Sequence, residues 1–365
     1  MERSAPSPYP SPPKTGARGP EKKFRRIAVL EAVCAGLCGE SPEPSLLAEG
    51  QAMRDAVLAD LQCIPGCTAI AASSLDEACD TDAAILIAPE TDGLLARLVT
   101  SAQQRPALRL WNATPSAIHL CTDKLELARH LTAHGIATLP TDLETWTAPP
   151  ISRCVIKPRD GAGSWLVRRV DDAADWRRVR TEYAASAATT IALRQPFVPG
   201  RALSIAAWFG DDFVDWLPIG EQRLSDDGRF RYLGGRLPAE LTADEAAAVL
   251  FLVQSAAATI PGLRGYIGFD VLQPADNPLR PLLVEINPRF TTSYVGYRRL
   301  IAENLLERWL TISCATAVSA VSDFPAGSSA RTADTAVAHR SILLPISTAP
   351  IEFDANGHFH GAPSR

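Results

Sequence analysis

Two apolar segments that each carry acidic residues place the strongest constraint on the fold. They are Ile267–Leu272 and Leu282–Asn287, and a polar loop separates them. Their spacing predicts a β-hairpin, and if the loop is symmetric, Asp270 lies directly opposite Glu285. Because Glu285 and Asn287 are two residues apart on one strand, their side chains point to the same face. The hairpin therefore brings three oxygen-bearing side chains together.

This oxygen-rich patch is a candidate metal site. Hard divalent cations such as Mg²⁺ bind carboxylate and amide oxygens, and Mg²⁺ commonly takes one or two carboxylates together with substrate phosphates. The alternative is an ordinary hairpin with a polar outer face. The flanking FDVL and LLVEI segments are apolar enough to be buried, and buried acids need a partner or a metal. The sequence therefore favours Asp270, Glu285 and Asn287 as metal ligands.

Length and charge restrict the class of protein. A chain of 365 residues exceeds the size of one compact core and predicts two or three folding units. The net charge of −5 disfavours a nucleic-acid partner, because such proteins are usually basic. The longest apolar runs fall short of the roughly 18 residues that a membrane-spanning helix needs, so no membrane association is expected.

Cysteine usage points to a reducing compartment. The eight cysteines, Cys314 among them, form no CxxC pair and have no zinc-finger spacing. We interpret them as small, mostly buried apolar residues of a cytoplasmic protein.

The order of apolar patterns predicts an α/β protein with several units. Strands at Ile27–Val33 and Ala83–Ala88, with a helix at Leu46–Leu61 between them, indicate a parallel α/β layer. A helix is expected at Thr122–His134, with Thr122 or Asp123 as its N-cap. The expected units are a disordered tail (1–24), a parallel α/β domain (25–115), a small subdomain with a glycine-rich loop (116–195), a large subdomain with the metal site (196–320) and a C-terminal extension (321–365).

A lysine beside a glycine-rich turn is a second candidate site. Lys157 ends the apolar strand Cys154–Lys157, and Gly161–Ser164 follows it. Glycines let backbone N–H groups approach phosphate oxygens closely, and an ammonium group adds positive charge. Taken alone, a plain turn with an extended surface lysine is the commoner explanation.

Together, in this order, the motifs resemble the ATP-grasp superfamily over roughly residues 115–310. The resemblance implies an ATP-grasp fold preceded by a parallel α/β domain. It implies that Arg289 and Lys157 are catalytic, with Arg289 contacting the transferred phosphate. The residues implied to bind ATP are Lys124, Lys157, Gly161, Ala162, Gly163, Ser164, Gln195, Pro196, Phe197 and Val198. Asp270, Glu285 and Asn287 would hold Mg²⁺ or Mn²⁺, two ions in all.

A narrower resemblance concerns the substrates. Ser45–Met53 and Asn287–Arg298 look like segments of the tyramine–glutamate ligases of methanofuran biosynthesis, including relatives in bacteria that oxidise one-carbon compounds. The resemblance suggests Arg298 for pairing a substrate carboxylate and Tyr294 for bordering the acceptor. An ordinary helix start explains both residues equally well.

The implied activity is an ADP-forming carboxylate–amine ligase that works through an acyl phosphate. The γ-carboxyl of L-glutamate and tyramine or a similar amine are the expected substrates, and a homodimer is compatible with the sequence. Two alternatives stay open: an ATP-grasp ligase with other substrates, or a non-catalytic nucleotide-binding regulator. Ala202 and Gly268, which depart from the family pattern, favour the regulator.

Overall fold

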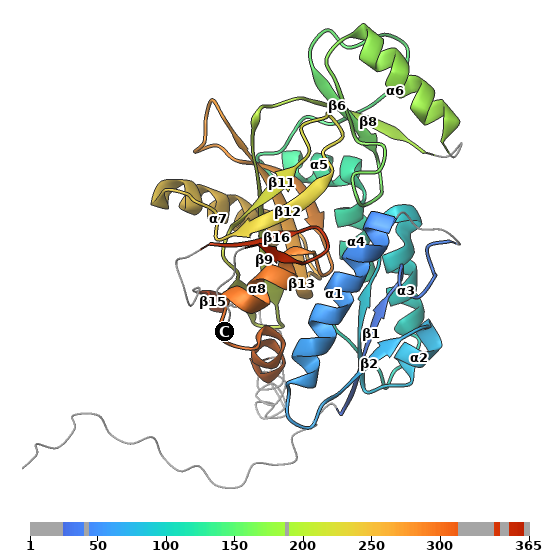
Figure 1. The fold of residues 1–365 in the computed structure, drawn as a ribbon, viewed down its shortest axis with the longest axis vertical. Helices are drawn as coiled ribbons and strands as arrows, with labels where there is room; N and C mark the ends of the chain where they lie inside the picture. The colour runs from blue at the N-terminus through green and yellow to red at the C-terminus, as the bar shows by residue number, and fades with distance from the viewer. Residues whose placement is uncertain (1–24, 40–43, 187–189, 313–338, 344–349, 361–365) are drawn as a thin grey trace, which may run out of the picture.

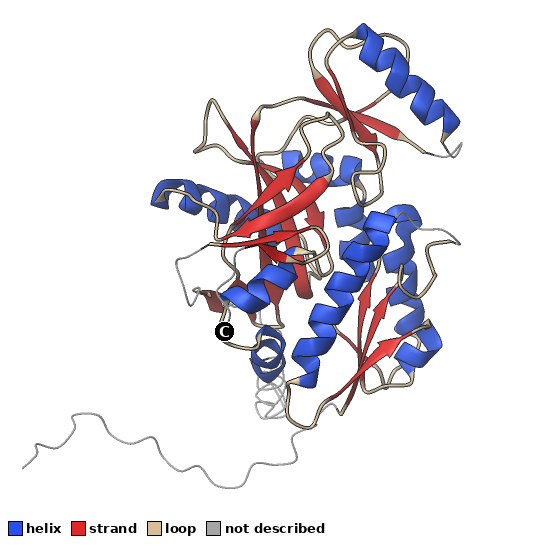
Figure 2. Cartoon of the chain, viewed as in Figure 1, coloured by secondary structure: helices blue, strands red, loops and turns tan. Residues whose placement is uncertain are grey.

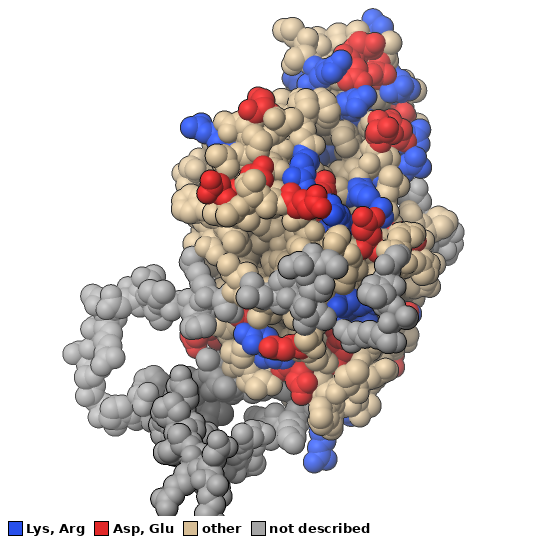
Figure 3. All heavy atoms as spheres, turned by 60° about the vertical axis from the view of Figure 1, so that its left-hand side comes forward, with Lys and Arg blue, Asp and Glu red and all other residues tan. Residues whose placement is uncertain are grey.

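The computed structural model describes residues 25–39, 44–186, 190–312, 339–343 and 350–360 (Figure 1). The tail expected at 1–24, Cys314 and part of the expected C-terminal extension lie outside these residues. No helix in the described ranges is long and apolar enough to cross a membrane. Figure 3 shows one face of the molecule, on which positive and negative side chains are interspersed.

The N-terminal part folds as the predicted parallel α/β layer. Its elements are β1 (Arg26–Glu31), α1 (Pro44–Gln62), β2 (Thr68–Ala72), α2 (Leu75–Cys79), β3 (Ala83–Ile87), η1 (Thr91–Gly93), α3 (Leu94–Ala102) and β4 (Arg109–Leu110). The strand order is β2-β1-β3-β4, with parallel pairing throughout. Ile27 and Val29 pack in the cluster that contains the apolar face of α1, whereas Ala28 and Leu30 pack with α2 and α3. Helices therefore cover both faces of the sheet (Figure 2).

A small antiparallel sheet follows two helices. The elements are α4 (Pro115–Thr122), α5 (Lys124–Ala133), β5 (Asp142–Leu143), β6 (Cys154–Pro158), β7 (Arg168–Val170), α6 (Ala173–Ala185) and β8 (Ala192–Pro196). The strand order is β5-β8-β6-β7. The helix expected at Thr122–His134 is confirmed as α5, with Asp123 as its N-cap and His134 as its C-cap, while Thr122 is the last residue of α4. The glycine loop extends to residue 167, so β7 is only three residues long.

A nine-stranded sheet forms the largest unit. Its elements are β9 (Gly200–Phe209), β10 (Phe213–Trp216), β11 (Gly220–Leu224), β12 (Tyr232–Leu237), α7 (Ala243–Ala258), β13 (Gly265–Pro274), β14 (Leu282–Asn287), α8 (Ser293–Leu300), β15 (His339–Ile342), β16 (Ile351–Asp354) and β17 (Phe359–His360). The main path is β14-β13-β9-β11-β12-β16-β17, and β10 pairs with β9 and β15. The last three strands belong to the expected C-terminal extension, which the sequence could not place.

The predicted hairpin is present, and Asp270 does lie opposite Glu285. Nearer the turn, Leu272 pairs with Leu282, so the register shifts by one residue and Val284 has no partner. The loop is therefore not symmetric, and a β-bulge at Val284 restores the expected pairing of the two acids. The bulge lies next to the acidic pair, where such irregularities commonly redirect side chains.

The cysteine prediction holds only in part. The described cysteines are free thiols, but of these only Cys121 and Cys154 are buried. Burial raises the pKa of the Cys121 thiol to about 12, which keeps it protonated and unreactive. The other described cysteines are half-buried or exposed, so the expectation that most would be buried is wrong.

Candidate active site

A cavity of about 750 Å³ lies between the small sheet and the central strands of the large sheet. This volume is within the range typical of sites for small molecules and cofactors, about 300–1,000 Å³. Strands β6 and β8 form one wall, and β9, β11, β13 and β14 form the other. Every residue that the sequence suggested for ATP, metal or catalytic contact lines this cavity: Lys124, Lys157, Gly161, Ala162, Gly163, Ser164, Gln195, Pro196, Phe197, Val198, Asp270, Glu285, Asn287 and Arg289.

The three oxygen-bearing side chains of the hairpin converge on the cavity. Asn287 Nδ2 donates to Asp270 Oδ2 at 3.0 Å, and Gln222 Nε2 donates to Asp270 Oδ1 at 2.8 Å. Glu285 Oε1 lies 3.2 Å from Lys124 Nζ. Gln222 was not singled out from the sequence, because its position depends on β11 reaching across the sheet towards β13. It holds Asp270 in place from the side opposite Asn287.

Buried charges shift the pKa values of this cluster in different directions. Burial and the neighbouring Glu285 raise the pKa of Asp270 to about 7. Burial alone would raise the pKa of Glu285, but Lys124 and Lys157 outweigh it and lower the pKa. Burial lowers the pKa of the Lys157 ammonium group to about 8. The site therefore holds two like-charged carboxylates whose mutual repulsion a cation would relieve.

The donor set of this cluster fits a divalent cation. Two carboxylates and an amide supply the hard oxygen ligands that Mg²⁺ or Mn²⁺ takes. Within the described ranges, no group of three or more His, Cys, Asp or Glu side chains is placed to hold a metal. Because Mg²⁺ requires near-octahedral coordination, an ion at Asp270, Glu285 and Asn287 would take further oxygen ligands from water or from a bound molecule, such as phosphate oxygens.

We expect Asp270→Asn to remove a pH-dependent destabilisation. The pKa of Asp270 is raised from 3.8 to about 7, so the stability it supports is complete below pH 4 and is lost as the pH rises through 7. Each pKa unit corresponds to about 1.4 kcal/mol, so between pH 5 and 8 the variant should gain about 3 kcal/mol relative to the unmodified protein, most of it between pH 5 and 7. Gln222 can flip its amide to accept from the new Nδ2.

The measurement is the thermal midpoint of both proteins in EDTA at pH 5 and pH 8. The exposed Asp276→Asn variant is the control. A difference between variant and unmodified protein that is the same at both pH values would contradict the prediction.

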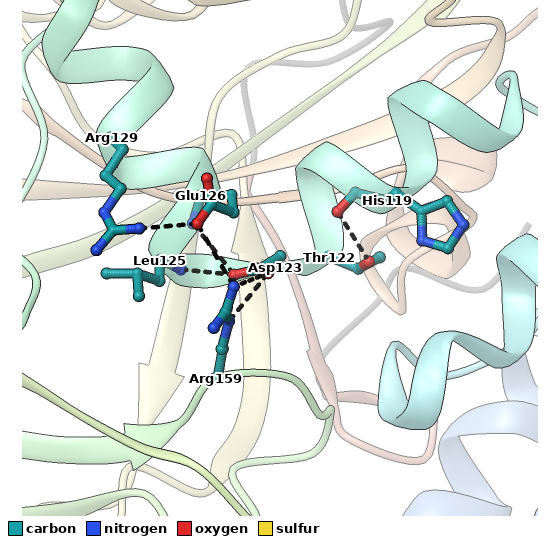
Figure 4. Close-up of polar contacts among 7 residues, drawn as sticks. All are labelled: His119, Thr122, Asp123, Leu125, Glu126, Arg129 and Arg159. Carbon is teal, nitrogen blue, oxygen red and sulfur yellow. Dashed lines mark hydrogen bonds and ion pairs between the residues drawn. The ribbon is translucent and has the colours of Figure 1, made fainter. Parts of the chain in front are cut away.

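Asp123 caps the start of α5 and binds Arg159 (Figure 4). The Asp123 carboxylate accepts from the N–H groups of Leu125 and Glu126, which caps the helix. It also accepts from Arg159 Nε and Nη2, the latter at 2.6 Å. As the first residue of α5, Lys124 is thereby directed inward, and it is 8% exposed. Asp123 thus serves as a structural anchor for Lys124.

The glycine loop lies against this lysine. Lys124 Nζ donates to the carbonyl of Gly161 at 2.9 Å. Gly161 and Gly163 have φ of +123° and +70°, which a residue with a side chain rarely adopts. Ser164 Oγ donates to the carbonyl of Phe230 at 2.7 Å and ties the loop to the β11–β12 connection. Two ammonium groups and a glycine-rich backbone therefore border the same space, which suits phosphate oxygens.

The opposite part of the cavity is less polar. Gln195 is 5% exposed and donates through Nε2 to Thr141 Oγ1 at 2.7 Å. Phe197 packs near Phe230, with ring centroids 6.4 Å apart. Trp165 is 44% exposed and lines the cavity. An apolar wall with a few polar groups suits a flat heteroaromatic ring.

Arg289 connects the cavity to the N-terminal layer. Its Nε lies 2.6 Å from Glu90 Oε1, and its Nη2 lies 2.8 Å from Glu90 Oε2. Glu90 follows β3 and is 1% exposed. Glu90 was not singled out from the sequence, although a polar residue just past the carboxyl end of a buried parallel strand is a recognised signal for a site.

Comparisons with known proteins agree with this arrangement. Residues 121–293 match the sequence profile of the ATP-grasp domain family. These residues form an ATP-grasp domain. The domain includes Lys124, Lys157, the glycine loop, Asp270 and Glu285, and the parallel layer precedes it. No curated protein matches the chain by sequence.

Solved structures show the same fold. A protein from Archaeoglobus fulgidus assigned to the ATP-grasp superfamily is 25% identical, with a TM-score of 0.60 over 78% of this chain and 87% of that one. An L-amino acid ligase from Bacillus licheniformis is 15% identical, with a TM-score of 0.56 over 80% and 75% of the two chains. A D-alanine–D-alanine ligase from Bacillus anthracis, complexed with ATP, is 16% identical, with a TM-score of 0.57 over 81% and 99%.

Two residues suggested for substrate contact lie away from the cavity of the ATP-grasp domain. Tyr294 and Arg298 are on α8, and neither lines the cavity. Tyr294 donates through its hydroxyl to Asp60 Oδ2 at 2.6 Å, and Arg298 Nη2 lies 2.6 Å from Asp60 Oδ1. Both side chains are directed to α1, because α8 turns them away from the site and Asp60 binds them there. Thr292 and Ser293, just before them, do line the cavity.

Proposed function

We propose that this protein is an ATP-dependent, ADP-forming ligase that joins a carboxylate to an amine through an acyl phosphate. The observation that carries the proposal is the convergence of Lys124, Lys157, Asp270, Glu285 and Arg289 on one cavity of an ATP-grasp domain. The described neighbours include an L-amino acid ligase and a D-alanine–D-alanine ligase, which supports the reaction class.

The residues have distinct roles in this reaction. The apolar wall near Phe197 would hold the adenine ring, and Lys124 and Lys157 would hold phosphate oxygens. A divalent cation at Asp270, Glu285 and Asn287 would neutralise charge on the phosphates. The glycine loop Gly161–Ser164 would exclude water, which would otherwise hydrolyse the acyl phosphate.

Bond formation proceeds in two steps under this proposal. The substrate carboxylate attacks the γ-phosphorus of ATP, forming an acyl phosphate and releasing ADP. The amine then attacks the acyl carbon, and phosphate leaves as the amide forms and a proton is lost. Negative charge develops on the transferred phosphoryl group, so preorganised positive groups such as Arg289 accelerate the first step.

The substrates are the finer part of the proposal. The γ-carboxyl of L-glutamate and tyramine or a similar amine are proposed on the resemblance of Ser45–Met53 and Asn287–Arg298 to the tyramine–glutamate ligases of methanofuran biosynthesis. Thr292 and Ser293 line the cavity, and under this proposal their hydroxyl groups would border the amine.

The experiment measures ADP and phosphate release from purified protein with ATP and Mg²⁺. Sustained release over many turnovers is expected only when both glutamate and tyramine are present, and mass spectrometry should detect the amide. If no ADP forms with this pair but ADP forms with another acid and amine from a panel, the proposed substrates are wrong and the proposed ligase activity stands. ATP binding without turnover, unaffected by Asp270→Ala, would favour the regulatory alternative.

A further inference from the structure

The ion pair between Glu90 and Arg289 joins residues 199 positions apart in the chain. Glu90 belongs to the parallel layer, and Arg289 follows β14 of the ATP-grasp domain. The guanidinium is paired through two parallel contacts of 2.6 and 2.8 Å, a geometry that fixes its orientation as well as its place. Both side chains are largely buried, at 1% and 12% exposure.

The pair leaves part of the guanidinium available. Arg289 Nη1 donates to the carbonyl of Phe290 at 3.0 Å, in addition to the two contacts with Glu90. Arginine has five N–H groups, so two of them have no acceptor among the described contacts. Arg289 lines both the large cavity and a smaller cavity beside it. The available N–H groups therefore belong to a cation that borders the space beside the hairpin acids.

The segment that carries Glu90 also contacts the glycine loop. The N–H of Asp92 donates to Asp160 Oδ2 at 2.8 Å. A Cβ on Gly161 would lie 4.0 Å from Thr91 Oγ1. Residues 90–92 thus contact both Arg289 and the loop proposed to cover the phosphates.

We propose that Glu90 is a positioning residue that orients Arg289 towards the γ-phosphate of the bound nucleotide. The inference rests on the proposed function. A buried ion pair adds little net stability compared with apolar residues of the same volume, so its fixed geometry is the property that this site uses. Without the Glu90 carboxylate, Arg289 would rotate among several orientations, and its contact with the terminal phosphate would weaken. Contacts with adenine and with the inner phosphates would persist.

The test compares two nucleotides by titration calorimetry with Mg²⁺: ADP, and AMP-PNP as a non-hydrolysable triphosphate. The readout is the ratio of their dissociation constants, which isolates the terminal phosphate and needs no turnover. Glu90→Gln places an N–H group against Arg289 Nη2, so one of the two contacts is lost. We expect the preference for AMP-PNP to fall by about tenfold, the loss typical of one charge-assisted hydrogen bond, while the affinity for ADP changes less than about threefold.

A double-variant cycle separates positioning from folding. Arg289→Lys keeps the positive charge but removes the planar guanidinium with its paired N–H groups. In this background Glu90→Gln should change the ratio of dissociation constants by less than about twofold, because Glu90 acts only through Arg289. Glu90→Asp shortens the side chain and should lower the ratio in the same direction, which keeps the test valid if Glu90→Gln does not fold.

The matched control is Asp60→Asn, which weakens another buried acid–arginine pair, outside the cavity. It should lower the thermal midpoint and leave the ratio unchanged. Two results would overturn this inference and leave the proposed function standing. One is that Glu90→Gln lowers the thermal midpoint but leaves the ratio of dissociation constants unchanged. The other is that Glu90→Gln changes this ratio equally in the unmodified and Arg289→Lys backgrounds. Absence of nucleotide binding by the unmodified protein would overturn the proposed function and this inference with it.

Discussion

Glu285→Gln is expected to reduce ADP formation by at least about a thousandfold, the usual scale for removing a preorganised charge from a reaction centre. The substitution keeps the size of the side chain and leaves an oxygen that Lys124 Nζ, now 3.2 Å from Oε1, can still contact. It removes the negative charge that a divalent cation at the hairpin would need. The fold should change little, since Glu285 faces the cavity and contributes no apolar packing.

Two measurements check this prediction. The first is the rate of ADP release with ATP, Mg²⁺ and both substrates. The second is the Mg²⁺ dependence of AMP-PNP binding, which should be largely lost whatever the substrates are. Glu303→Gln, at an exposed ion pair with Arg308, is the control and should behave like the unmodified protein. Turnover within tenfold of normal would rule out Glu285 as a metal ligand.

Asp60→Ala is expected to destabilise the protein by about 3–5 kcal/mol, the typical loss when one partner of a buried ion pair is removed. Asp60 is 7% exposed and binds Tyr294 and Arg298 together. Without it, the Tyr294 hydroxyl and the Arg298 guanidinium lose their partner at the contact between α1 and α8. The thermal midpoint should fall by roughly 6–20 °C, at about 2–4 °C per kcal/mol.

Thermal unfolding followed by circular dichroism measures this effect. Asp76→Ala is the control, because it removes the partner of an exposed arginine, Arg105. It should change the free energy of unfolding by no more than about 1 kcal/mol. Affinity for AMP-PNP should be unaffected in Asp60→Ala below its unfolding temperature. If Asp60→Ala instead weakens nucleotide binding without lowering stability, Tyr294 and Arg298 contribute to the binding site.

Most features of the β13–β14 hairpin could be predicted from the local sequence pattern. Alternation of side chains along a strand is a property of the backbone, so the shared face of Glu285 and Asn287 follows from spacing alone. The pairing of Asp270 with Glu285 also agrees with the structure. The bulge at Val284 was not predictable, because it depends on how β14 bends over the neighbouring strands.

Lys157 and the glycine loop Gly161–Ser164 could also be predicted from local sequence. A lysine at the end of an apolar strand and a glycine-rich turn after it are contiguous in the chain, so their proximity is fixed by covalent connection. Lys157 and Gly161–Ser164 accordingly line the cavity. The position of Trp165 at the cavity was not predictable, because an aromatic residue is equally suited to a core and to the wall of a ligand site.

The sequence alone determined the parallel layer, the two acids of the hairpin and the lysine with its glycine loop, since each is encoded by periodicity or by adjacency of residues. Only the tertiary structure decided that Glu90 holds Arg289, and that Arg298 binds Asp60 across 238 positions instead of facing the cavity. Such pairs depend on how separately formed units pack together. A local pattern carries no information about which distant surface will meet it.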